Sequence, residues 1–169
     1  DHGEMLGDFY CTTKTLFHRQ AVETPLVIKP PARLEDCPRG TVSDALVELI
    51  DVGSTFLHIA GTSLEGSRGK SLLPILRGEA DPAQHRDMAR SQVNDVHMVQ
   101  TADRKLIYRS EDTRDPAEGY ELLSFYNLAE DPQELHNLLP EHMEEALAFF
   151  EKSEVPFYRD TTDWLPPQW

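Results

Sequence analysis

The sequence predicts an α/β fold, and three features of its hydrophobic pattern lead to this prediction. A short apolar run at residues 25–28 is bounded by prolines, which is typical of a buried strand that leads into a turn. Apolar residues at helical spacing follow over residues 42–61. The pattern then changes to the alternation of antiparallel strands over residues 86–110, and an amphipathic helix follows at residues 141–152.

The first half of the chain is expected to hold one strand and two helical segments. After the strand, a loop rich in proline leads to the longer helical segment, which we expect in two pieces around Gly53. Asp51 is expected to cap the N-terminus of the second piece, and Gly61 is expected to end it. A short helical turn is expected at residues 71–78.

The second half is expected to begin with a hairpin, with one strand at residues 96–100 and the other at residues 105–109. A third strand is expected near residues 120–128. An Asp-Pro pair at residues 131–132 predicts a helical turn, because proline is favoured at the first helical position. The tail, residues 155–169, is expected to lie over the surface with its two tryptophans packed in grooves.

The composition limits which classes of protein this chain can belong to. The chain has 169 residues, one domain's worth, with 16 basic and 30 acidic residues and a net charge of −14. This acidic balance predicts no nucleic-acid partner and no binding to an anionic membrane surface. No apolar run approaches the roughly 20 residues of a membrane span. Two cysteines are too few for a disulfide scaffold, although a single bridge stays open.

The chain opens with Asp1-His2-Gly3 and shows no signal peptide, because a charged segment followed by an apolar one is lacking. We therefore expect that something upstream has been removed or that the sequence is a fragment. The compartment is therefore not predicted, and a cytoplasmic and a periplasmic or secreted location both stay open.

The densest group of chemically useful residues is at the start. Asp1 and His2 offer a carboxylate oxygen and an imidazole nitrogen, both good ligands for a divalent cation. Gly3 permits a sharp turn, and Lys14 would place an ammonium near an anionic substrate oxygen. A cation and an ammonium together offset charge on a phosphoryl or sulfuryl group during transfer. From the residues alone, an ordinary loop with a solvated lysine is the alternative.

The opening residues also resemble the sulfatase family of the alkaline-phosphatase superfamily. Residues 1–8 match its pattern D-[HN]-G-x-x-L-G-(D/E), and Lys14 and a strand similar to V-P-L-I follow. Four later blocks resemble the family in the same order, at residues 47–61, 69–76, 104–108 and 125–138. Each block is only moderately specific, and the five together make the resemblance strong.

The resemblance implies a more detailed architecture. Residues 1–80 would form the C-terminal part of an alkaline-phosphatase-like α/β/α catalytic core. Residues 81–169 would form a C-terminal α+β subdomain, a small antiparallel sheet with a packed helix, and the tail.

The resemblance also implies roles for individual residues. Asp1 and His2 match two ligands of the active-site divalent ion, for which Ca²⁺ is expected. Mn²⁺ is the alternative, because His2 replaces the asparagine of many arylsulfatases with a softer ligand. Lys14 matches the catalytic lysine that contacts the sulfate oxygens. His18, on the loop after Lys14, is a candidate substrate contact, and its alternative is a packing or surface histidine.

The implied reaction is metal-dependent hydrolysis of a small-molecule or carbohydrate sulfate ester by a formylglycine nucleophile. The family's C/S-x-P-x-R motif, which yields the formylglycine, does not occur in these 169 residues. We therefore expect this chain to be the C-terminal part of a longer enzyme and to be inactive alone. A phosphonate monoester or phosphodiester hydrolase of the same superfamily, and a non-catalytic domain that keeps the fold, are the alternatives. The oligomeric state is not predicted.

Overall fold

The computed structural model describes residues 1–32, 34, 36–110 and 119–159, and the two tryptophans of the tail lie outside these residues. The chain forms two compact units by contact. Residues 25–89, together with Asp1, make the first unit, and residues 2–24 together with the chain from Arg90 onward make the second. The domain boundary expected between residues 80 and 81 stays a prediction. Among the described residues, every helix is too short or too polar to cross a lipid bilayer.

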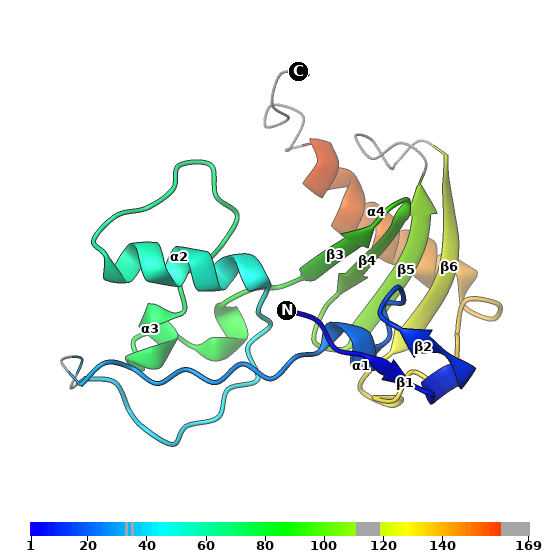
Figure 1. Ribbon diagram of the computed structural model, residues 1–169. Coiled ribbons are helices and arrows are strands. Elements are labelled where there is room, and N and C mark those ends of the chain that lie inside the picture. Colours follow the sequence, from blue (N-terminus) through cyan, green and yellow to red (C-terminus); the bar gives the residue numbers. More distant parts are fainter. Residues whose placement is uncertain (33, 35, 111–118, 160–169) are drawn as a thin grey trace. The chain divides into compact units, whose positions relative to one another are not determined.

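The first unit is built on helices. Its elements are α2 (Leu49–Ile59), α3 (Leu73–Leu76) and the 3-10 helix η2 (Pro82–Gln84), with the two α-helices labelled in Figure 1. The α3 turn confirms the helical turn expected there.

The start of the predicted long helix is wrong, because residues 41–48 are not helical and α2 is a single helix through Gly53. Glu48 is the N-cap, and its backbone N–H donates to the Asp51 side chain, 2.9 Å away. Asp51 therefore lies inside the first turn instead of capping it. The expected end is confirmed, since Gly61 follows the helix with a φ of 77°.

The predicted strand at residues 25–28 is also wrong. This segment has no regular structure, and Val27 is 91% exposed. A strand needs a neighbour for its backbone hydrogen bonds, and the described strands form two other sheets, β1-β2 and β3-β4-β5-β6. An apolar run bounded by prolines carries no local information about its partner strand.

The second unit contains both sheets. Its N-terminal part holds β1 (Met5–Leu6), the 3-10 helix η1 (Asp8–Tyr10), β2 (Thr12–Thr13) and α1 (Arg19–Val22). The four-stranded antiparallel sheet and the last helix follow: β3 (Ala89–Val93), β4 (Val96–Gln100), β5 (Arg104–Ser110), β6 (Tyr120–Asn127) and α4 (Met143–Arg159). The predicted hairpin, third strand, packed helix and α/β class are confirmed. The helical turn predicted at residues 131–132 is wrong, because these residues form a non-helical turn.

Both faces of this sheet are covered, which explains why consecutive residues of β5 are buried. On one face Tyr108 packs edge-on against Phe150 of α4, with ring centroids 5.0 Å apart. On the other face Phe17 joins Ile107 and Tyr126 in a buried cluster. Alternate residues of β5 therefore face α4 and the N-terminal segment, and four consecutive residues are buried. The sheet is the rigid base on which the N-terminal segment lies.

We predict that the isolated 169-residue chain unfolds without a sharp cooperative transition. Large apolar side chains of the first unit are exposed, with Val42 at 95% and Phe56 at 68%. Exposed apolar surface of this kind contributes nothing to stability and binds hydrophobic probes. Calorimetry is expected to show a broad transition, with an unfolding free energy below about 5 kcal/mol, and the folded chain is expected to bind a hydrophobic dye. A narrow transition without dye binding would contradict this.

Candidate functional site

A tight hairpin brings His2 and Lys14 together. β1 pairs antiparallel with β2, with Met5 opposite Thr13. The loop between the strands is closed by a hydrogen bond from the Gly7 N–H to the Cys11 carbonyl, and Gly7 adopts the left-handed φ of 117° that this turn requires. As a result, Lys14 Nζ lies 2.6 Å from His2 Nε2, although the residues are twelve positions apart. Both side chains are exposed.

The two ring nitrogens of His2 have different partners. Nδ1 lies 2.6 Å from the Gly3 carbonyl oxygen, to which it donates, and Nε2 accepts from the Lys14 ammonium. The neutral imidazole with its proton on Nδ1 satisfies both contacts. Histidines that bind metals use the same arrangement, with one nitrogen on a carbonyl and the lone pair of the other on the ion. Since Nε2 has one lone pair, it serves either Lys14 or a cation.

The residue types at the start of the chain are suitable ligands for a divalent cation, but they are too few for a complete metal site. His2 offers a suitably oriented nitrogen, and Asp1, which is exposed and directly precedes it, offers a carboxylate. Throughout the part of the chain that the structure describes, no three His, Cys, Asp or Glu side chains gather into a group that could hold a metal ion. Asp1 and His2 therefore supply at most two ligands of a complete site.

Gly3 connects the start of the chain to α1. Its backbone N–H donates to the Ala21 carbonyl at 2.8 Å. A Cβ atom at this position would lie 1.9 Å from the Gln20 carbonyl oxygen, which no side chain can accommodate. The glycine of the opening motif is thus explained by the close approach of two backbone segments. The position of His2 depends on the position of α1.

His18 lies directly before α1 and is held by packing and a hydrogen bond. Its ring stacks on Phe9 with centroids 4.0 Å apart, and its Nδ1 lies 3.0 Å from the Oε2 atom of Glu134. The side chain is only 15% exposed. This geometry agrees with the packing alternative weighed for His18, and contact with a substrate stays a prediction.

A buried ion pair beneath this loop was not foreseen from the sequence. Glu134 and Lys105 are both almost completely buried, and the Lys105 ammonium donates to the Glu134 carboxylate. Burial raises the pKa of Glu134, but the hydrogen bond from His18 and the charge of Lys105 together outweigh it and hold the pKa below its usual value. Burial lowers the pKa of Lys105, and Glu134 opposes that effect. The available signal was a lysine at the first position of a predicted strand, directly before three apolar residues.

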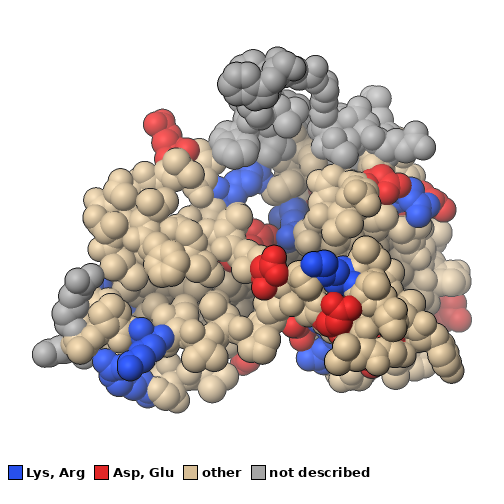
Figure 2. Space-filling view, viewed as in Figure 1, with Lys and Arg blue, Asp and Glu red and all other residues tan. Residues whose placement is uncertain are grey.

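Charged side chains of both signs occur on the surface of the chain. On the face drawn in Figure 2, Lys and Arg side chains lie in separate places, and Asp and Glu side chains lie beside several of them. The net charge of −14 opposes long-range attraction of an anionic substrate. A cation such as Lys14 therefore acts on an anion at short range.

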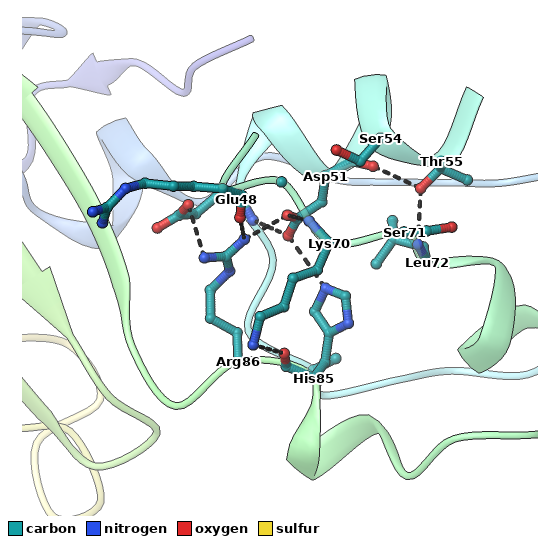
Figure 3. A network of polar contacts seen from close by, with 12 residues as sticks. Glu48, Asp51, Ser54, Thr55, Lys70, Ser71, Leu72, His85 and Arg86 are labelled. Carbon is teal, nitrogen blue, oxygen red and sulfur yellow. Dashed lines mark hydrogen bonds and ion pairs between the residues drawn. The ribbon is translucent and has the colours of Figure 1, made fainter. Parts of the chain in front are cut away.

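A second polar cluster lies within the first unit, around the fully buried Asp51 (Figure 3). Its Oδ1 atom accepts from the Lys70 N–H at 2.7 Å and from Arg86 Nη2 at 2.5 Å. Its Oδ2 atom accepts from the Glu48 N–H at 2.9 Å and lies 3.3 Å from His85 Nε2. Burial raises the pKa of Asp51, but the two amides and the Arg86 guanidinium outweigh it, so the pKa lies below the usual 3.8.

The contacts of this cluster join α2 to the segment before α3. Thr55 donates to the Asp51 carbonyl at 2.6 Å and accepts from the Leu72 N–H at 2.8 Å. Gly69 lies so close to α2 that a Cβ atom would be 2.5 Å from the Ile50 carbonyl oxygen. Both Asp51 carboxylate oxygens already accept hydrogen bonds from the protein. The cluster therefore holds the first unit together.

Comparison with known sequences assigns most of the chain to one group. Residues 7–155 match the sequence model of a family described as N-sulphoglucosamine sulphohydrolase, C-terminal. An arylsulfatase of Clostridium perfringens (strain 13 / Type A) is 28% identical over 144 residues, which cover 82% of this chain and 28% of that protein.

Solved structures share the fold. BT4656, solved in complex with its substrate D-glucosamine-2-N,6-O-disulfate, has a TM-score of 0.72 and 25% identity, over 94% of this chain and 33% of that one. The phosphonate monoester hydrolase of Agrobacterium radiobacter also has a TM-score of 0.72, with 21% identity, over 95% of this chain and 34% of that one. These matches confirm the predicted resemblance and fold. The chain spans about a third or less of the length of these relatives.

We predict that Asp51→Asn lowers the unfolding free energy of the complete protein by about 3 kcal/mol at pH 7. The change removes the buried charge that pairs with Arg86 and puts an NH2 group where a carboxylate oxygen accepts hydrogen bonds, although Arg86 keeps its ion pair with Glu48. The folded pKa of Asp51 is depressed, so its contribution is present above the unfolded value of 3.8 and is lost as the pH falls through the lower, folded pKa. Urea denaturation should show the difference between variant and wild type shrinking below pH 3.8.

Asp44→Asn is the matched control, because Asp44 is exposed in the same unit. It should leave the urea midpoint unchanged. Equal midpoints for Asp51→Asn and the wild type at pH 7 would contradict the framework role of the cluster.

Proposed function

The chain belongs to the family described as N-sulphoglucosamine sulphohydrolase, C-terminal, and from that premise we propose that it is part of an enzyme that hydrolyses sulfate esters. The observation that carries the proposal is the 2.6 Å contact between His2 and Lys14. It joins a candidate cation ligand and a cationic side chain at one exposed hairpin, and two such groups can offset the charge on a sulfuryl group during hydrolysis. The likeness to an arylsulfatase over most of the chain supports the same reaction.

The substrate we propose is a sulfated carbohydrate. Support comes from BT4656, whose substrate in the solved complex is a glucosamine disulfate and whose chain is 25% identical to this one. A small aryl sulfate is expected to serve as a simpler substrate in assays, since the arylsulfatase relative is named for such esters.

Lys14 is the catalytic residue of this chain in the proposal. Its ammonium would contact the sulfate oxygens and offset the negative charge that develops on them during hydrolysis. The ammonium has three N–H donors, and one of them now donates to His2 Nε2. A cation bound at Nε2 would take the lone pair that accepts this hydrogen bond, so the ammonium would move away from the ring when the cation binds. The long flexible side chain of an exposed lysine permits this movement without a change in the backbone.

Asp1 and His2 would hold a divalent cation, for which Ca²⁺ is expected and Mn²⁺ is the alternative. When bound, such an ion acts as a Lewis acid that polarises the oxygens of the ester. His2 would use Nε2 for this, while its Nδ1–H stays on the Gly3 carbonyl and fixes the ring. Further ligands and the formylglycine nucleophile would come from a polypeptide segment outside these 169 residues, because the C/S-x-P-x-R motif is absent from them.

A phosphonate or phosphodiester hydrolase is the second candidate. His2 is compatible with it, because the family resemblance associates histidine at this position with phosphonate monoester hydrolases as well as with sulfatases. The complete protein separates the two: a higher kcat/KM on an aryl sulfate than on an aryl phosphonate or phosphodiester supports a sulfatase, and the reverse order overturns it. Absence of activity on all three supports a non-catalytic domain.

We predict that Lys14→Ala lowers kcat/KM of the complete protein on an aryl sulfate by about 100- to 1000-fold, the effect of removing one group that stabilises developing charge. Lys14→Arg should retain part of the activity, because it keeps the charge but changes its geometry. Steady-state kinetics with the metal-loaded protein provide the measurement.

Lys29→Ala removes the same charge from an exposed lysine of the other unit and is the matched control. It should leave kcat/KM unchanged. Full activity of Lys14→Ala would contradict the catalytic role proposed for Lys14.

We further predict that His2→Ala weakens the affinity of the complete protein for Mn²⁺ and Ca²⁺ by at least about tenfold. Loss of a hydrogen bond that supports a metal ligand already lowers metal affinity by about 10- to 100-fold, and loss of the ligand itself should have a larger effect. Asp1→Ala should act in the same direction. His2→Asn should shift the preference toward Ca²⁺, because an amide oxygen is a harder ligand than imidazole. Calorimetric titration of the metal-free protein measures these affinities.

His142→Ala is the control for these titrations, since His142 is a half-exposed histidine next to α4. Its affinities should equal those of the wild type. Wild-type affinities in both His2→Ala and Asp1→Ala would show that the cation binds elsewhere.

A further inference from the structure

The Glu134 carboxylate is directed at the loop that carries Lys14. Its Oε2 atom accepts a hydrogen bond from His18 Nδ1 at 3.0 Å and another from the Arg19 backbone N–H at 3.2 Å. Arg19 is the first residue of α1, so the carboxylate satisfies an amide that has no partner within the helix. Arg19 also donates from Nη1 to the Pro132 carbonyl at 2.9 Å.

Lys105 adds a contact with Phe17, the residue before His18. Its ammonium, on β5, donates both to the Glu134 carboxylate and to the Phe17 carbonyl oxygen, the latter at 3.0 Å. Two buried side chains of opposite charge thus hold three consecutive residues, 17–19. Because both charges are removed from water, the pair fixes geometry more strongly than an exposed salt bridge would.

The backbone of Glu134 is itself in an uncommon conformation. Its φ is 60°, in the left-handed region that residues with a side chain rarely adopt. The conformation ends a turn in which the Glu134 N–H donates to the Asp131 carbonyl at 3.1 Å. A strained residue persists where its surroundings hold it in place, and such residues are frequent near functional sites.

Two connections lead from residues 17–22 to the candidate site. Lys14 precedes Phe17 by three residues, and the Gly3 N–H bonds to the Ala21 carbonyl of α1. The backbone positions of both Lys14 and His2 therefore depend on where α1 lies. We propose that Glu134, paired with Lys105, is a positioning residue for Lys14: it sets the place of α1 and, through it, the place of the Lys14 ammonium. This inference rests on the proposed function.

A role in overall stability alone would also explain a buried ion pair, so the test must separate the two. If Glu134 acts through Lys14, its removal has less to disturb once the Lys14 ammonium is absent, and the two effects on the rate do not multiply. If Glu134 only stabilises the fold, the effects multiply and follow the fraction of folded protein.

The experiment is a double-mutant cycle in the complete, metal-loaded protein with an aryl sulfate as substrate. It compares the wild type, Glu134→Gln, Lys14→Ala and the variant with both changes. Glu134→Gln keeps the shape of the side chain but removes its charge. We expect it to lower kcat on the order of 10- to 100-fold, as displacement of a catalytic group by about 1 Å does, with KM little changed, and to have little effect in the Lys14→Ala background.

Equal factors for Glu134→Gln in both backgrounds, or a loss that tracks the folded fraction measured by circular dichroism, would overturn the proposal. If Lys14→Ala itself has no effect, the proposed function fails, and that result is distinct from a failure of the positioning role. Glu121→Gln is the matched control, because Glu121 is an exposed glutamate on β6 of the same unit. It should leave kcat unchanged.

A second variant keeps the proposal testable if Glu134→Gln does not fold. The combination of Glu134→Gln with Lys105→Met removes both charges, so no buried charge is left unpaired. It should fold and show the same loss of kcat with the same dependence on Lys14. A folded variant of this kind with the kcat of the wild type would also overturn the positioning role.

Discussion

The buried contact between Lys105 and Glu134 is the constraint on which the candidate site depends. It joins a strand of the sheet and a turn after the sheet to the N-terminal segment, which is 88 positions away from Lys105 along the chain. Removing two charges from water is costly, and an apolar pair is often as stable. What an ion pair adds is directional contact, here with the backbone of Phe17 and Arg19. The same contacts leave Lys14 and His2 at the surface on a segment whose base is fixed.

Each of the two units contains a buried carboxylate that holds nearby backbone segments in place, with different partners. In the first unit, Asp51 accepts hydrogen bonds from backbone amides and from Arg86, which orders the start of α2 and the loop before α3. In the second, Glu134 holds the start of α1 in place by accepting a hydrogen bond from the Arg19 backbone N–H. Both carboxylates have a pKa below the usual value because their partners outweigh the effect of burial. Buried acids that stay charged in this way give the loops around them defined positions.

Local patterns in the sequence were sufficient for the antiparallel sheet and its helix. The alternation within β4 and β5 and the apolar spacing of α4 are properties of short segments, and both predictions are confirmed. The family resemblance placed His2 and Lys14 in one loop, and the structure brings their side chains into contact, while their roles stay predictions. The start of α2 was missed because its cap involves Asp51, whose other partners, Lys70 and Arg86, are distant in the sequence.

Long-range pairing accounts for the other differences. Residues 25–28 have the composition of a strand, but a strand also needs a neighbour, and the sequence pattern of one segment does not specify it. Lys105 and Glu134 are 29 positions apart, and neither periodicity nor residue type shows that they meet. The contact of His18 Nδ1 with Glu134 was likewise not visible in the sequence, and the role of His18 as a substrate contact stays a prediction. Contacts between residues so far apart in the sequence are formed only in the folded chain, when the sheet is assembled.

We infer above all that His2 and Lys14 belong to one site, in which a cation binds the His2 nitrogen that otherwise accepts a hydrogen bond from the Lys14 ammonium. A crystal structure of the complete protein grown with Mn²⁺ tests this directly, because the ion is located by its anomalous scattering. We expect an anomalous peak at His2 Nε2 and the Asp1 carboxylate, with the Lys14 ammonium moved off the ring. A peak at other side chains, with Lys14 still on His2, would contradict it.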